Sequence, residues 1–227
     1  MEQCKGLIAG IDIGYSKIQA SVYSYNSRNV QTVKLTEDSK EKTSLANVVA
    51  ECMRATGTSQ IQSICVTIPD YHSDEISAVR DTLKKCDVSD GRGQVLSRVE
   101  SFAYYAYSQK KELYQNGTVL MDYNASGIDV YRLYCNKIGD MQYILQEHTL
   151  SQPEGSTIEK ASHSVTLYMT EYFKKHRASS VYLTGMGFDV DRLPDEFTKV
   201  LVAGRKAFVG QNLYCLLYTS PSPRDRT

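Results

Sequence analysis

The sequence predicts an α/β protein in which one order of strands and helices occurs twice, giving two lobes with mixed sheets. Each half of the 227-residue chain opens with three short predicted strands, followed by an amphipathic helix, a strand and a second helix. The two halves also share a register, because Asp12 and Asp122 each end a first strand and a turn asparagine follows fourteen residues later, at Asn26 and Asn136. Internal duplication of this kind indicates two similar structural units.

The individual elements follow from apolar spacing. The first half is expected to form strands at 7–13, 17–25, 30–35, 64–68 and 94–99. Its helices are expected to run from Leu45 to Gly57, from a cap at Ser73 onward, and from Glu100 to about Lys111. The second half repeats the order with strands at 118–123, 128–135, 141–147 and 181–184, a long helix at 158–172 and a last helix from about Asp191.

Composition excludes several classes of partner and location. Lys plus Arg number 26 and Asp plus Glu number 26, so the formal charge is zero, which argues against nucleic acid or an anionic membrane as the main partner. The apolar run 7–13 is too short to span a bilayer and lacks the features of a signal peptide. The six cysteines show neither a CxxC pair nor metal-ligand spacing, so they indicate buried thiols in a reducing cytoplasm.

The C-terminal tail, residues 215–227, lacks periodicity and follows abruptly on a helical pattern. Its segment Cys215–Asp225 matches, residue for residue, the translation of a transposase-based sequencing adapter. We therefore expect the tail to be read-through that packs against nothing, with Tyr214 as roughly the last genuine residue and the natural protein continuing beyond it. A disordered Ser/Pro-rich tail is the alternative interpretation.

The segment Gly10–Lys17, with the sequence Gly-Ile-Asp-Ile-Gly-Tyr-Ser-Lys, places a carboxylate and a glycine in a tight turn between two strands. Backbone N–H groups can close on phosphate oxygens only where no Cβ intrudes, and a carboxylate beside them can hold hydrated Mg²⁺. The pattern fits a phosphate-binding turn, although an ordinary hairpin turn would use the same residues.

Five segments match nucleotide-binding motifs in the right order along the chain. Gly10–Lys17 resembles the first phosphate motif of actin-like proteins. Ile64–Asp74 resembles a chaperone strand ending in Val-Pro-x-Tyr before a helix, and Val99–Tyr107 resembles the chaperone helix Glu-Pro-Thr-Ala-Ala-Ala-Leu-Ala. Met121–Asp129 occupies the second phosphate motif, and Leu183–Gly187 with Pro194 resembles the adenosine motif. Together the segments resemble a divergent member of the actin-like ATPase and heat-shock-chaperone superfamily, truncated at its C-terminus.

The resemblance implies an actin-like fold of two duplicated ribonuclease-H-like lobes, lobe I at 1–116 and lobe II at 117–214, holding ATP and Mg²⁺ between them. By the resemblance, Asp12 and Asp122 would complete the Mg²⁺ shell, and Glu100 would orient or activate the attacking water, with Asp122 assisting the reaction. The residues that would meet the nucleotide are Asp12, Gly14, Ser16, Lys17, Gly127, Gly185 and Gly187. Without a nucleotide, Asp12 would be a turn residue, Glu100 an acid favoured at a helix N-terminus, and the last two glycines a plain turn.

The sequence also departs from the family. Asn124, Ala125 and Ser126 replace the three glycines of the chaperone's second phosphate motif, and each added Cβ crowds a phosphate. The insertions that form the outer subdomains are nearly absent. We therefore expect nucleotide binding with weak or absent hydrolysis. A nucleotide-free scaffold, acting through a protein partner or self-assembly, is the alternative, and a sugar or acetate kinase is a third possibility.

Overall fold

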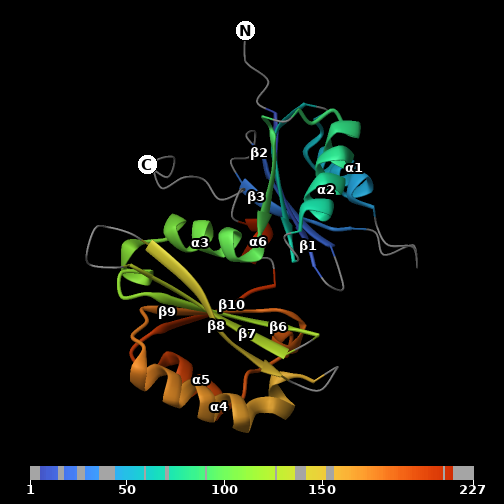
Figure 1. Cartoon of the computed structure of the whole chain (residues 1–227). Helices are drawn as coiled ribbons and strands as arrows, with labels where there is room; N and C mark the ends of the chain where they lie inside the picture. Colours follow the sequence, from blue (N-terminus) through green and yellow to red (C-terminus); the bar gives the residue numbers. More distant parts are fainter. Residues whose placement is uncertain are drawn as a thin grey trace. The chain divides into compact units, whose positions relative to one another are not determined.

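The computed structural model describes residues 6–14, 18–24, 29–35, 44–58, 60–69, 72–89, 91–125, 127–135, 142–151, 156–211 and 213–216. The chain divides into two compact units (Figure 1). Unit 1 comprises Met1–Tyr105 together with Asn212–Thr227, and unit 2 comprises Ala106–Gln211. This division differs from the boundary expected after residue 116. The boundary instead falls between residues 105 and 106, inside one helix, and the chain returns to unit 1 at residue 212. Among the described helices, none is long and apolar enough to cross a bilayer.

Unit 1 is built on a mixed sheet with strand order β3-β2-β1-β4-β5. Strand β1 runs antiparallel to β2 and parallel to β4, and β4 runs parallel to β5. The elements of this unit are β1 (Leu7–Ile13), β2 (Ile18–Ser24), β3 (Asn29–Val33), α1 (Leu45–Thr56), β4 (Ile61–Ile68), α2 (Ser73–Lys85), β5 (Gly93–Ser97), α3 (Arg98–Ser108), which continues into unit 2, and α6 (Leu213–Leu216).

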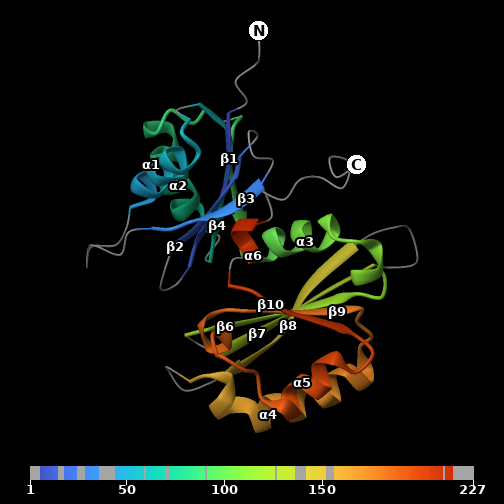
Figure 2. The same cartoon turned by 180° about the vertical axis from the view of Figure 1, so that it is seen from behind.

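The two faces of the unit 1 sheet have different covers. Successive strand residues point to opposite faces. Leu7, Ala9 and Ile11 belong to the apolar core that includes the buried residues of α1 and α2. Gly10 and the other even-numbered residues of β1 therefore face the opposite side, where α6 contacts β1, β2 and β4. Figures 1 and 2 show α1 and α2 on one side of this sheet and α6 on the other.

The ends of the first two helices are only partly as predicted. Helix α1 has Ser44 as its N-cap, accepting a hydrogen bond from the Asn47 backbone N–H at 3.3 Å, and Gly57 closes it in the left-handed region at φ 64°. Ser73 is the first residue of α2 rather than its cap. His72 occupies the N-cap position in extended conformation, without a side-chain capping bond. The acidic residues of the first turn instead favour the positive end of the helix dipole.

Unit 2 repeats the architecture with strand order β10-β9-β6-β7-β8. Its apolar core packs one face of the sheet against α4 and α5, as Figure 1 shows. The elements are η1 (Lys111–Leu113), β6 (Thr118–Asn124), β7 (Gly127–Cys135), β8 (Gln142–Ser151), α4 (Ile158–Lys175), β9 (Ser180–Thr184), η2 (Met186–Phe188), α5 (Asp195–Val202) and β10 (Lys206–Val209). Both sheets follow the same pattern, third-second-first-fourth-fifth strand of the unit, so the predicted duplication is confirmed.

The last elements were not expected from the sequence. Strand β10 pairs in parallel with β9, and α6 follows it in the position that α3 has after β5. Cys215 is fully buried within α6, so the prediction that the tail packs against nothing is wrong for this residue. Residues 217–227 lie outside the described part of the chain. The adapter origin of the tail stays a prediction.

Candidate functional site

Asp12 lies at the carboxyl end of β1, with Gly14 directly after the strand. Ligands of open α/β sheets bind outside the carboxyl ends of the parallel strands, so this edge is the natural place for a site. The side chain is buried, with Asp12 only 5% exposed, and Thr67 of β4 is its partner in the parallel ladder. Ser16 and Lys17, predicted to meet phosphates, lie outside the described residues.

Arg98 forms an ion pair with Asp12, and it was not among the predicted site residues. Its Nη2 atom lies 3.8 Å from Asp12 Oδ2, an ion pair longer than a hydrogen bond, between side chains that are 12% and 6% exposed. The guanidinium also lies over the ring of Tyr214, 5.1 Å from its centroid. Burial raises the pKa of the neighbouring Cys215 thiol to about 12, and the negative charge of Asp12 adds to the shift. Asp12 is thus enclosed by α3 and α6.

Glu100 lies in the first turn of the same helix but has a different role. Its Oε2 atom accepts hydrogen bonds from the Ser97 backbone N–H at 2.9 Å and from the Ser97 hydroxyl at 2.8 Å. The Glu100 backbone N–H in turn donates to Ser97 Oγ at 3.2 Å. This reciprocal pattern is a capping box, which satisfies N–H groups that the helix start leaves without partners. The sequence Ser97-Arg98-Val99-Glu100 carries the signal, and it would have placed the helix start at Arg98.

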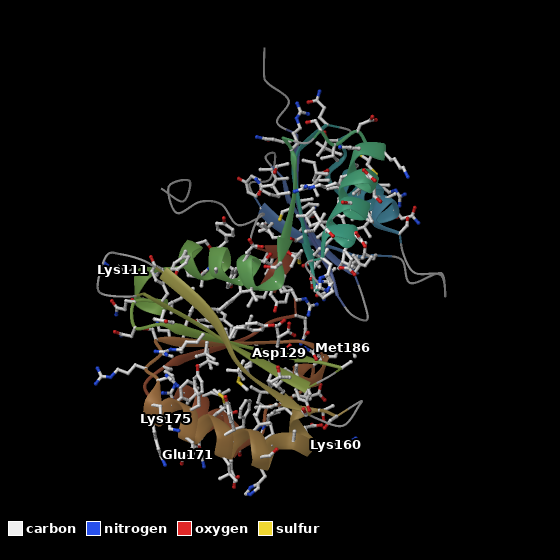
Figure 3. All side chains as sticks on the ribbon, viewed as in Figure 1. Lys111, Asp129, Lys160, Glu171, Lys175 and Met186 are labelled. Atoms are coloured by element: carbon white, nitrogen blue, oxygen red, sulfur yellow. The ribbon has the colours of Figure 1, made fainter. Side chains whose placement is uncertain are left out.

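Asp122 occupies the equivalent position in unit 2, at the end of β6. It is 3% exposed and faces Asp129 of β7 and Thr184 of β9 across the two ladders. Asp129, labelled in Figure 3, accepts hydrogen bonds from Asn124 Nδ2 at 2.8 Å and from Thr149 Oγ1 at 2.6 Å. Asn124, which stands where the chaperones have a glycine, therefore has a structural contact. Gly127 is buried at φ 136°, and an added Cβ would meet the Leu150 carbonyl of β8.

Gly185 and Gly187, the predicted adenosine glycines, pack against protein. Gly185 has φ 97°, and a Cβ there would collide with the Tyr123 backbone. A Cβ on Gly187 would overlap the Tyr123 ring, which is buried and meets the Phe188 ring edge-on at 5.4 Å between centroids. The absence of side chains at these two positions thus makes room for Tyr123. Asp122 and Gly185 lie at neighbouring strand ends, because Asp122 pairs with Thr184.

The residues of unit 1 do not fit the Mg²⁺ ion that the fold family implies. The predicted anchor, the Asp12 carboxylate, already faces the positive guanidinium of Arg98 inside the protein. A hydrated dication at this carboxylate would have to lie next to a group that stays protonated at any physiological pH. In the part of the chain that the structure describes, three or more His, Cys, Asp or Glu side chains nowhere gather in a metal-binding group.

Comparison with known proteins identifies the family. The model of the family described as "Family of unknown function (DUF5716) C-terminal" matches residues 25–216. The chain belongs to this family. The match begins directly after β2 and covers β3 to α6. Among the curated proteins, a search found no significant match.

Solved structures define the fold of this DUF5716 family member. The inorganic polyphosphate/ATP-glucomannokinase from Arthrobacter sp. strain KM is 13% identical with a TM-score of 0.59, covering 95% of this chain and 97% of its own. The ethanolamine utilization protein EutJ from Carboxydothermus hydrogenoformans is 13% identical with a TM-score of 0.55, covering 96% and 91%. The ROK hexokinase from Thermus thermophilus is 12% identical with a TM-score of 0.54, covering 94% and 97%. The chain has the actin-like ATPase fold of mixed α/β type.

Proposed function

We propose that this protein is a nucleotide-binding actin-fold protein that takes ATP or a relative and does not hydrolyse it. The observation that carries the proposal is the capping box of α3. Glu100 stands where the resemblance puts the residue that activates water, and its carboxylate accepts two hydrogen bonds from Ser97. This carboxylate is thereby part of the helix cap, a role that competes with positioning an attacking water. The actin-like fold and the glycine directly after β1, Gly14, support binding.

A nucleotide-free scaffold is the second candidate, and the packing at Gly187 favours it. In the resemblance, this glycine lets a nucleoside lie against the backbone, whereas here the ring of Tyr123 occupies the space beside it. A scaffold would act through a protein partner or through self-assembly, and we propose a cytoplasmic location for either candidate. Two of the similar structures are named as sugar kinases. Sugar phosphorylation by this chain would need a substrate-side base, for which Glu100 was the only candidate.

Thermal unfolding with added nucleotide separates the two candidates. A ligand that binds only the folded state stabilises it by roughly 2.7 kcal/mol at a hundredfold excess over its dissociation constant. We expect millimolar ATP and ADP to raise the melting temperature, while phosphate release stays at the background rate. Unchanged melting with every nucleotide would establish the scaffold instead. Phosphate release that Glu100→Gln abolishes would contradict the non-hydrolysing assignment.

A further inference from the structure

We infer that Arg98 is a built-in cation that takes the place of Mg²⁺ at Asp12, so that the phosphate-site carboxylate of unit 1 is independent of metal. The inference concerns the site of the proposed function but does not require a bound nucleotide. It rests on contacts within unit 1, all between described residues. It reassigns Asp12 from metal anchor to internal ion-pair partner.

The first step is the burial of Asp12. The residue is 5% exposed at the end of the central strand β1, and its neighbours in the sheet are Gln19 and Thr67. An ionised carboxylate loses most of its hydration in such a place, so the fold must supply an opposite charge or strong hydrogen bonds. The Arg98 guanidinium, 3.8 Å away, is that charge. In a nucleotide site, the same compensation would come from the hydrated metal.

The second step is the way in which Arg98 is held. It is the first residue of α3, and the capping box between Ser97 and Glu100 fixes the helix start on either side of it. Its guanidinium lies over the Tyr214 ring of α6, and its side chain is only 12% exposed. A guanidinium stacked on an aromatic ring is restrained in orientation and keeps its proton. The positive charge at Asp12 is therefore a permanent part of the protein.

The third step is the closure of the same face by α6. Ser21 of β2 donates to the Cys215 carbonyl oxygen at 2.6 Å, and Gly10 leaves the space for this carbonyl beside β1. Tyr214 and Cys215 are almost fully buried. The ion pair thus joins the end of β1 to α3, and the stacking contact joins α3 to α6. A hydrated metal ion at Asp12 would have to displace this set of contacts.

A double-mutant cycle tests the pairing. The variants are Asp12→Asn, Arg98→Met and the two combined, with Arg98→Lys as the charge-conserving replacement. We expect Arg98→Met to lower the melting temperature strongly in the wild-type background and much less beside Asp12→Asn, because the neutral amide needs no counter-charge. Arg98→Lys should recover part of the loss. Arg92→Met is the matched control, since Arg92 donates to the Ile61 carbonyl oxygen and should act independently of Asp12.

Titration with Mg²⁺ tests whether Arg98 takes the place of the metal at Asp12. The experiment uses the wild type and Asp12→Asn, so it remains informative if Arg98→Met does not fold. We expect the wild-type melting temperature to be the same in millimolar Mg²⁺ and in EDTA, and any nucleotide-induced shift to be equal in both. A Mg²⁺-dependent rise in the wild type that Asp12→Asn removes would overturn the inference, as would equal effects of Arg98→Met in both backgrounds. Failure of the proposed function would give a different result: no nucleotide would change the melting temperature, with or without Mg²⁺.

Discussion

Ser97 and Glu100 exchange hydrogen bonds through both their side chains and their backbones, and the exchange fixes where α3 begins. The start of the helix in turn decides where the Arg98 guanidinium lies relative to Asp12. The exposed carboxylate of Glu100 therefore influences the surroundings of the buried Asp12 carboxylate, because it fixes the helix start that positions Arg98. The resemblance had assigned Glu100 a role in the transition state of hydrolysis, whereas the structure gives it a role in folding. The two roles respond differently to substitution.

Replacing Glu100 and Ser97 one at a time distinguishes the two roles. Ser97→Ala should lower the free energy of unfolding by about 1 kcal/mol, the usual cost of losing an N-cap side chain. Glu100→Gln should change it by less than about 0.5 kcal/mol, because Gln also completes a capping box. Glu100→Ala should resemble Ser97→Ala. Urea denaturation followed by circular dichroism measures all three, and a Glu100→Ala variant as stable as wild type would contradict the capping role.

The turn between β9 and α5 contains glycines that resemble a nucleotide-binding motif but are explained by packing within the protein. Gly185 and Gly187 were predicted to line an adenosine site, and both lie against Tyr123. Phe188 of the same turn stacks on Phe197 of α5, with 6.1 Å between ring centroids, and continues the apolar core of unit 2. The aromatic packing needs the close approach of this turn to β6. Sequence alone could not separate the two reasons, since each requires glycine.

Adding one methyl group to this turn tests the packing. Gly187→Ala should lower the free energy of unfolding by about 1–3 kcal/mol, because the new Cβ overlaps the Tyr123 ring and forces it to move. Gly210→Ala is the matched control in the same unit. Its Cβ would meet nothing within 4 Å, and the expected change is within about 0.5 kcal/mol. Equal effects of the two substitutions in thermal unfolding would show that Tyr123 does not occupy the space.

At the scale of the whole molecule, unit 1 consists of two distant stretches of chain. Its sheet lies in the first hundred residues, but α6 comes from residues 213–216 and contributes Leu213, Tyr214 and Cys215 to the interior. The hydrogen bond from Ser21 to the Cys215 carbonyl spans 194 positions in sequence. Removing α6 would therefore expose one face of β1, β2 and β4 in a unit that is otherwise intact.

Two truncations test the dependence of unit 1 on α6. A chain that ends at Leu216 should melt like the full chain, as the adapter hypothesis also predicts for the residues after it. A chain that ends at Gln211 should lose about 5 kcal/mol, the order expected for exposing three buried apolar side chains. Hydrogen exchange measured by mass spectrometry should then rise in β1, β2 and β4. Unchanged exchange in these strands would show that α6 does not protect them.

The sequence was sufficient for the duplication, because the apolar runs of β1, β2, β6 and β7 and the amphipathic spacing in α1 and α4 follow from the burial of these elements. It was insufficient for β10, which has only four residues between Gly204 and Gly210, and for α6, which lies in a segment without periodicity. The positions of Asp12 and Asp122 at strand ends could be predicted. The pairing of Asp12 with Arg98 could not be predicted, because it depends on how the first residue of α3 lies beside the end of β1 in the folded unit.

The return of the chain to unit 1 at α6 has a consequence for synthesis on the ribosome. Unit 2, Ala106–Gln211, is complete before α6 has been translated, whereas unit 1 waits for residues that are made after all of unit 2. Domains usually fold in the order of their synthesis, with the N-terminal one first. Here we expect the order to be reversed. The emerging strands of unit 1 would stay exposed to chaperones until α6 leaves the exit tunnel and Cys215 reaches Gly10.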